Sequence, residues 1–167
     1  MVHSRAPGFP VLLVAAAFLV GTCTPASFPL KITDLSASPD PVVGRIVNLE
    51  VETESSRDEA DVTILIQLPE GVRLIDGELT WRGSLVAGEP YRHRASLCVL
   101  YEGDWRVDVT ASSRLGPDDV EGDYKTIHLI STSEKGEAIP GQKYRIIQGS
   151  PAPFQTPSPV PTPATCS

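Results

Sequence analysis

Alternation of apolar and polar side chains is the strongest pattern in the middle of this chain. Residues 60–68 read ADVTILIQL, and the polar members Asp61, Thr63 and Gln67 all have the same parity. Four of the apolar members have the other parity: Val62, Ile64, Ile66 and Leu68. Because successive side chains of a strand point to opposite faces, this segment predicts a half-buried β-strand. Residues 69–71, Pro-Glu-Gly, predict a turn after it, since proline cannot continue a central strand.

Similar short segments, separated by turn residues, continue to about residue 130. Strands are predicted at residues 30–35, 45–54, 60–68, 72–75, 78–82, 91–101, 105–111 and 124–130, with a candidate edge strand at 143–147. No window shows sustained helical periodicity. Strands at this spacing predict an all-β domain over residues 30–148, an antiparallel two-sheet sandwich of about seven or eight strands.

The alternation also assigns a face to each strand. The side chains expected to point inward are Val47, Leu49, Val51, Thr53, Leu79, Trp81, Tyr91, His93, Ala95, Leu97, Val99, Tyr101, Trp105, Val107 and Val109. Two hairpins are expected. Strand 45–54 should pair with strand 60–68, and strand 91–101 should pair with strand 105–111 through a tight turn at residues 102–104.

The N-terminal 22 residues have the composition of a secretory signal peptide. Arg5 supplies a positive charge, residues 11–20 are uninterruptedly apolar, and the small residues Gly21 and Thr22 follow. The apolar run is about half of the roughly 20 residues that a membrane-spanning helix needs, which disfavours an uncleaved anchor.

Residues 19–23, LVGTC, resemble the bacterial lipobox, in which the cysteine becomes the acylated first residue of a lipoprotein. The resemblance implies lipid attachment at Cys23, with residues 23–29 as a tether and the membrane as a partner. Each buried methylene of such a lipid is worth about 0.8 kcal/mol. The alternative is cleavage after Ala26, which would remove Cys23 and give a secreted protein. Both alternatives place the mature protein outside the cytoplasm.

The C-terminal residues 149–167 are rich in proline, interleaved with Ser, Thr and Ala. Such a segment has too little apolar surface to offset the entropy of ordering it, so a disordered tail is expected. Deleting residues 150–167 should then leave the melting temperature nearly unchanged.

Two cysteines follow Cys23, and their spacing leaves their state open. Cys98 falls inside a predicted strand, and Cys166 lies at the end of the tail. An exported protein could join them in a disulfide. Alternatively, Cys98 is a free thiol packed as a small apolar side chain, and Cys166 has no structural role. The chain has no CxxC sequence, so the cysteines lack the spacing of a zinc site.

The net charge of the chain is minus 7, with 14 basic and 21 acidic residues. An acidic domain repels phosphate backbones, so nucleic acid is not expected as a partner. A core of about 100 residues buries enough surface to fold without a cofactor or metal, and none is predicted.

Turn and core positions in residues 68–111 carry a resemblance to a known family. They are Leu68, Pro69 and Gly71, then Trp81, Gly83 and Leu85, then Ala87, Gly88 and Glu89. Residues 39–44, PDPVVG, before the strand at 45–54 fit the same pattern. These residues resemble the immunoglobulin-like modules repeated in bacterial cell-surface proteins. The resemblance implies an immunoglobulin-like or fibronectin-like fold and little chemistry, and only one copy fits in this chain.

A catalytic site needs titratable groups that converge. Outside the leader the only histidines are His93, expected in the core or at its rim, and His128, expected to face solvent. Cys98 has the opposite parity to His93 on the same strand, so this histidine cannot activate the thiol. The chain is therefore not expected to be an enzyme.

The remaining candidate sites have simpler alternatives. A short acidic segment could bind Ca²⁺ through hard oxygen ligands or be a solvated turn: Asp118, Asp119, Glu121 and Asp123. Four aromatic side chains could form a sugar-binding platform or pack in the core: Trp81, Tyr91, Tyr101 and Trp105.

Outward arginines have an explanation that needs no ligand. Arg92, Arg94 and Arg106 fall on the outer face of the second expected hairpin, opposite Asp104 and Asp108, so cross-strand ion pairs are expected.

These observations predict an exported, lipid-anchored envelope protein whose non-catalytic module acts in adhesion, envelope architecture or assembly with another envelope protein. The alternative function is that of a secreted small-ligand or carbohydrate-binding module.

Overall fold

The computed structural model describes residues 29–114, 116, 120–141 and 162–167. The leader, Cys23, the tether up to residue 28, the candidate strand at 143–147 and most of the proline-rich segment lie outside the described residues.

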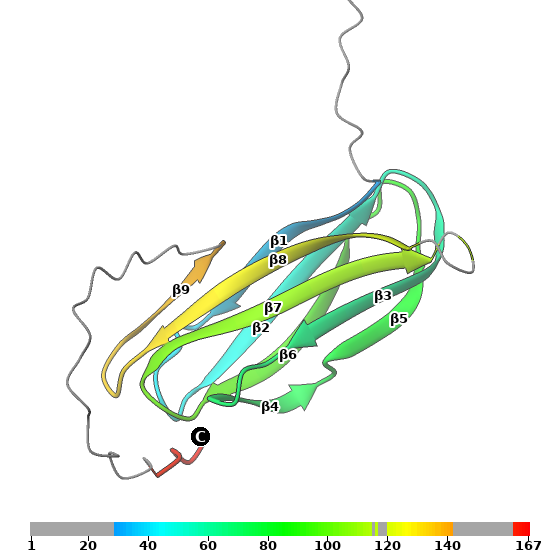
Figure 1. The fold of residues 1–167 in the computed structure, drawn as a ribbon. Coiled ribbons are helices and arrows are strands. Elements are labelled where there is room, and N and C mark those ends of the chain that lie inside the picture. Colours follow the sequence, from blue (N-terminus) through cyan, green and yellow to red (C-terminus); the bar gives the residue numbers. More distant parts are fainter. Residues whose placement is uncertain (1–28, 115, 117–119, 142–161) are drawn as a thin grey trace, which may run out of the picture.

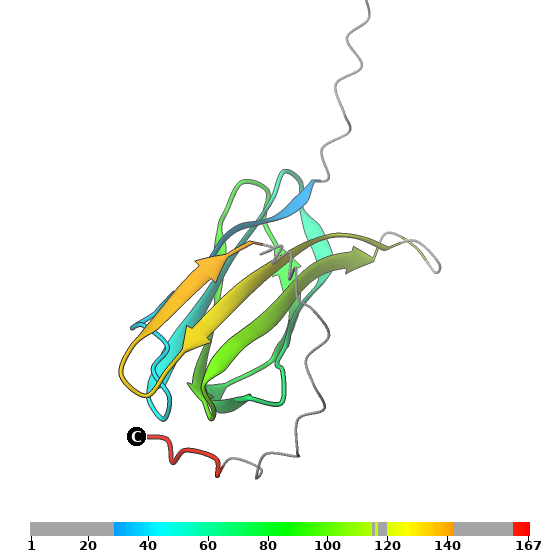
Figure 2. The same ribbon diagram turned by 60° about the vertical axis from the view of Figure 1, so that its left-hand side comes forward.

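The described residues form nine strands and no helix. One antiparallel sheet has four strands in the order β1-β2-β6-β4, and the other has five in the order β5-β3-β7-β8-β9. Figures 1 and 2 show the two sheets as the layers of a β-sandwich. The strands are β1 (Leu30–Ser38), β2 (Ile46–Ser55), β3 (Glu59–Gln67), β4 (Val72–Gly77), β5 (Thr80–Leu85), β6 (Tyr91–Val99), β7 (Gly103–Arg114), β8 (Val120–Ser131) and β9 (Gly136–Pro140).

The core lies between the facing sides of the two sheets, and the inward parity predicted from the sequence is confirmed. Alternate residues of β2 and β6 contribute from the four-stranded sheet, and alternate residues of β3, β7 and β8 contribute from the other. The fully buried side chains include Val47, Leu49, Val51, Val62, Ile64, Leu97, Val99, Val107, Val109, Ile127 and Leu129. No helix long and apolar enough to span a membrane occurs in the part of the chain that the structure describes.

Both expected hairpins are wrong. β2 pairs with β1 and β6, whereas β3 pairs with β5 and β7. Likewise β6 pairs with β2 and β4, whereas β7 pairs with β3 and β8. The β2–β3 and β6–β7 connections therefore cross from one sheet to the other. Alternation could not reveal this, because it assigns a buried face to each strand but does not identify the strand beside it.

The observed hairpins are β1–β2, β7–β8 and β8–β9. β9 was not predicted, since its five residues include a glycine and a proline and show no clear alternation. Gly136 at its start is required by a close backbone approach, because a Cβ there would collide with the Pro41 carbonyl.

The two ends of the sandwich differ in what they carry. At the entry end, where β1 begins, the Ser56 amide donates to the Pro29 carbonyl and the Gly88 amide donates to the Ser55 carbonyl. At the opposite end, which we call the tail end, lie the loop before β2, the β6–β7 connection and residues 162–167. Figure 1 shows β1 starting at one end and the C-terminal residues at the other.

Candidate functional site

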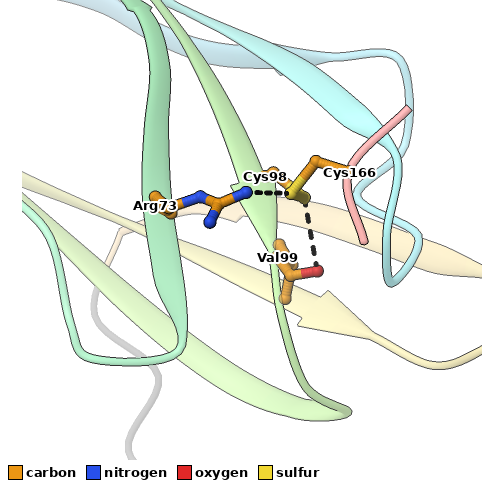
Figure 3. Close-up of a disulfide and its surroundings, with 4 residues drawn as sticks. All are labelled: Arg73, Cys98, Val99 and Cys166. Carbon is orange, nitrogen blue, oxygen red and sulfur yellow. Dashed lines mark hydrogen bonds between the residues drawn. A yellow bond between two sulfur atoms is a disulfide. The ribbon is translucent and has the colours of Figure 1, made fainter. Parts of the chain in front are cut away.

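A disulfide joins Cys98 to Cys166 at the tail end, so the structure has the paired form of the two alternatives that the sequence left open (Figure 3). Leu97 and Val99 point into the core, so Cys98 lies on the outer face of the four-stranded sheet. It is nevertheless fully buried. The two Cα atoms are 6.1 Å apart and 68 residues apart in sequence. The bond thus fastens the C-terminal segment to β6.

Backbone hydrogen bonds hold the same segment. The Ala164 amide donates to the Leu100 carbonyl at 3.0 Å, and the Ser167 amide donates to the Gly44 carbonyl at 3.0 Å. The expected disorder through residue 167 is therefore wrong for residues 162–167. Composition missed this because one covalent bond and two hydrogen bonds supply what apolar burial does not.

A hollow of about 340 Å³ lies between the segment and the body of the domain. Most of its lining is apolar or aromatic, and the lining residues are Val43, Leu100, Tyr101, Glu102, Thr162 and Ala164. The fastened segment therefore forms part of the molecular surface at the tail end.

Arg73 is a charged residue beside the disulfide, and no pattern in the sequence indicates its position. It faces Cys98 directly in the β4–β6 ladder, and its Nη2 atom donates to Cys166 Sγ at 3.2 Å (Figure 3). Its importance depends on the pairing of β4 with β6, for which the sequence offers no signal.

Charged pairs cross the outer face of the four-stranded sheet. Arg92 Nε lies 2.8 Å from Glu52 Oε2, and Arg94 Nε lies 2.6 Å from Glu50 Oε2. The hydrogen bond from Arg92, with a smaller one from Thr33, lowers the pKa of Glu52. For Arg92 and Arg94 the expected partners Asp104 and Asp108 were wrong, because β6 and β7 lie in different sheets. Exposed pairs of this kind contribute little stability.

Beside these pairs is a polar hollow of about 540 Å³ on the same face. Ser96 Oγ donates to Asn48 Oδ1 at 2.9 Å at its edge. The residues that line the hollow are Ser36, Ser38, Asn48, Leu49, Glu50 and Arg94. Its lining of hydroxyl, amide and charged groups can hydrogen-bond a polar ligand.

The third outward arginine finds its partner within its own strand. Arg106 Nε lies 2.7 Å from Asp108 Oδ1, and the Tyr124 hydroxyl donates to the same carboxylate oxygen at 2.7 Å. The Asp108 hydrogen bond and, to a lesser degree, desolvation raise the pKa of Tyr124.

The two histidines lie apart from each other and from the disulfide. His93 is buried, with Nε2 2.8 Å from the Glu78 carbonyl oxygen, as expected for a core or rim position. It lies on the opposite face of β6 from Cys98, as parity predicted. His128 Nδ1 lies 2.7 Å from Asp104 Oδ1. The side chain of His128 is on the outer face but only 13% exposed, which is less than expected.

The acidic segment is only partly described, because Asp118 and Asp119 lie outside the described residues. Glu121 pairs with Arg57. Asp123 accepts the backbone amide of Ile32 at 2.9 Å. Both carboxylates therefore connect β8 to other parts of the domain. Among the residues that the structure describes, no three metal-ligating side chains come together.

A buried carboxylate near the entry end was also missed. Glu59 is 5% exposed, and its oxygens accept hydrogen bonds from Ser113 Oγ at 2.5 Å and Arg57 Nε at 2.7 Å. Burial alone would raise the pKa of Glu59, but the bonds from Ser113 and Arg57 outweigh it, so the pKa is lowered. Glu59 is the first residue of β3, and its polar type gave no signal of burial.

The aromatic side chains pack rather than form an exposed platform. Trp81 and Tyr91 stack with their ring centroids 4.1 Å apart, and both pack against the core. Trp105 donates its indole N–H to the Tyr101 carbonyl at 2.8 Å, and its ring lies over Gly71. The pKa of Tyr91 is raised by burial and by the charge of Glu78.

No protein-family model and no curated protein matches this sequence. Among solved structures, the chain is similar to one described as "Crystal structure of the C-terminal domain of wzt". The two share 16% sequence identity with a TM-score of 0.46, over 77% of this chain and 86% of that chain.

Proposed function

We propose that this protein is an exported, lipid-anchored immunoglobulin-like module without catalytic activity, which acts in adhesion, envelope architecture or assembly with another envelope protein. The observation that carries the proposal is the Cys98–Cys166 disulfide. Disulfides persist in oxidising compartments outside the cytoplasm and are rare inside it. The bond therefore agrees with the leader over residues 1–22.

The strand order supports the immunoglobulin-like part of the proposal. In an immunoglobulin constant-type sandwich, strands A-B-E-D form one sheet and C-F-G the other. With β1 to β4 as A to D and β6 to β8 as E to G, the orders β1-β2-β6-β4 and β3-β7-β8 match both sheets. β5 and β9 are then additions at the two edges of the second sheet.

The position of the entry end supports a membrane-anchored arrangement. Six residues lie between Cys23 and Leu30, and the fully extended chain from one to the other spans at most about 25 Å. An acyl chain on Cys23 would hold the entry end close to the membrane. The tail end, on the opposite side of the domain, would then face outward and be available to partners.

Detergent partitioning of the full chain tests the anchor. The wild-type protein should enter the detergent phase, and Cys23→Ser should move to the aqueous phase, since it cannot be acylated. Ser27→Ala in the same tether is the matched control and should partition as wild type. Equal partitioning of Cys23→Ser and wild type would remove the lipid anchor from the proposal.

A small-ligand or carbohydrate-binding module is the second candidate, favoured by the polar hollow on the four-stranded sheet. In a glycan-array screen, saturable binding that is lost in Asn48→Ala without unfolding would support it. Trp81→Ala tests the aromatic alternative, which the packing of Trp81 against Tyr91 disfavours.

A further inference from the structure

Arg73 has a position that its role in the sheet does not explain. It is exposed and lies directly opposite Cys98 on the neighbouring strand, so the two side chains share the outer face. Its guanidinium reaches Cys166 Sγ at 3.2 Å. Among the described residues it forms no ion pair within 4.0 Å, unlike Arg57, Arg92, Arg94 and Arg106. Its charge is therefore directed at the sulfur atoms.

We propose that Arg73, Cys98 and Cys166 form a thiol–disulfide exchange site, at which Arg73 promotes closure of the C-terminal segment by an external disulfide oxidant. A neighbouring arginine stabilises a thiolate, which is the reactive form of cysteine. Cys98 is held opposite Arg73 by the β4–β6 ladder, whereas Cys166 reaches this place only with its segment. Cys98 is fully buried while the segment is fastened, so the oxidant reaches it only when the segment is released in the reduced protein. Cys98 is then the first nucleophile, and Cys166 is the resolving thiol.

The exchange proceeds in two balanced steps. The Cys98 thiolate attacks one sulfur of the oxidant RSSR, which forms a Cys98–SR mixed disulfide and releases RS⁻. The Cys166 thiolate then attacks Cys98 Sγ, which forms the Cys98–Cys166 bond and expels the second RS⁻. The two cysteine thiols lose two protons and two electrons, and the oxidant gains them as two thiols.

Among the described residues, Arg73 is the charged side chain that contacts the cysteine pair. On β2 the residue opposite Cys98 is the uncharged Ile46, preceded by the exposed Arg45. On β4 the nearest acidic residue is Asp76, which pairs with Ser96 rather than Cys98.

The expected increase in the closure rate due to Arg73 depends on two opposing effects. A thiol pKa lowered by about one unit raises the thiolate fraction near pH 7 about tenfold, but the thiolate also becomes less nucleophilic. With a Brønsted coefficient of about 0.4–0.5, the net gain is about three- to fourfold near pH 7. Near pH 10 all the thiols are ionised, so the gain disappears or reverses.

The test measures closure of the reduced full-length protein by bis(2-hydroxyethyl) disulfide, a neutral oxidant that is not attracted by arginine. Alkylation and mass spectrometry follow the loss of free Cys98 and Cys166. Wild type should close about threefold faster than Arg73→Met at pH 7 and no faster at pH 10. Arg73→Lys should retain most of the gain, and the control Arg45→Met should close as wild type.

A second measurement keeps the inference testable if Arg73→Met folds poorly. In Cys166→Ser, the pH dependence of Cys98 alkylation should have a midpoint below the ordinary value of about 8.5. Adding Arg73→Lys should preserve that shift. Equal closure rates at pH 7, a rate ratio that stays constant with pH, or an unshifted Cys98 midpoint would each overturn the proposal. None of these outcomes bears on the lipid anchor.

Discussion

At the scale of single residues, the sandwich depends on apolar side chains that have no contact with water. Ile64 is the clearest case, since it is fully buried in the central part of β3. Its neighbour Thr63 lies on the outer face of the same strand and is only half-buried. Placing the same residue, aspartate, at each of the two positions therefore tests the assignment of faces.

Ile64→Asp should unfold the domain, because it buries a charge without a partner. We expect a loss of more than about 4 kcal/mol, which belongs to the most damaging class of substitutions. Thr63→Asp should melt close to wild type. Thermal unfolding followed by circular dichroism measures both, and a cooperative, near-native melt for Ile64→Asp would show that the face assignment is wrong.

Gly71 is required by the ring of Trp105. A Cβ at this buried position would collide with the indole, so Gly71→Ala should destabilise the domain by about 1–3 kcal/mol through overpacking. The tryptophan fluorescence should shift as the ring moves. Gly116→Ala is the control, since a Cβ there meets no described atom within 4 Å.

Glu59 should make stability depend on pH in the acid range. Its folded pKa lies below the ordinary 4.5, because the bonds from Ser113 and Arg57 outweigh the effect of burial. The stabilisation by the ionised carboxylate is complete above about pH 4.5 and is lost as the pH falls through the folded pKa. The free energy of unfolding of wild type should therefore approach that of Glu59→Gln as the pH is lowered from about 5. Glu54→Gln, outside this network, should follow wild type throughout, and a constant gap between wild type and Glu59→Gln would contradict the assignment.

At the scale of elements, the sequence predicted strands and faces better than pairing. The alternation in β3 and β6 identified their buried side chains, because burial on one face leaves a two-residue period. The partners of β6 were not predictable, since β2 and β7 have equally good alternation and only one of them is adjacent. The ion pairs of Arg92 and the position of Arg73 beside Cys98 depend on this pairing, so they were not predictable either.

The fastened C-terminal segment changes the expected effect of removing the tail. Closing a loop of 68 residues costs the unfolded chain about 4 kcal/mol of entropy. Without the bond, however, the segment is also released from the folded domain, since only two backbone hydrogen bonds hold it besides the disulfide. Breaking the bond therefore returns chain entropy to the folded state as well as to the unfolded state. Most of the roughly 4 kcal/mol then cancels in the free energy of unfolding.

We expect Cys166→Ser to lower stability by about 1 kcal/mol, which corresponds to a fall of about 5 °C in the melting temperature. Deleting residues 162–167 should have the same effect, because it removes the same contacts. Differential scanning calorimetry of both variants measures it. An unchanged melting temperature would show that the segment contributes nothing to the folded domain, as its composition alone suggests.

At the scale of the whole molecule, two features lie at opposite ends of one sandwich. The entry end follows the proposed acylation site after a short tether, and the tail end carries the disulfide, Arg73 and the hollow beside Val43 and Leu100. With the proposed acylation at Cys23, the tail end of the sandwich would point away from the membrane.

Peptide mapping by mass spectrometry, on protein taken from intact cells and alkylated before any reduction, tests the central claim most directly. We predict an acylated Cys23 as the first residue and one cross-linked peptide pair that contains Cys98 and Cys166. An intact leader beginning at Met1, with both cysteines recovered as alkylated thiols, would contradict the proposal of an exported and disulfide-fastened module.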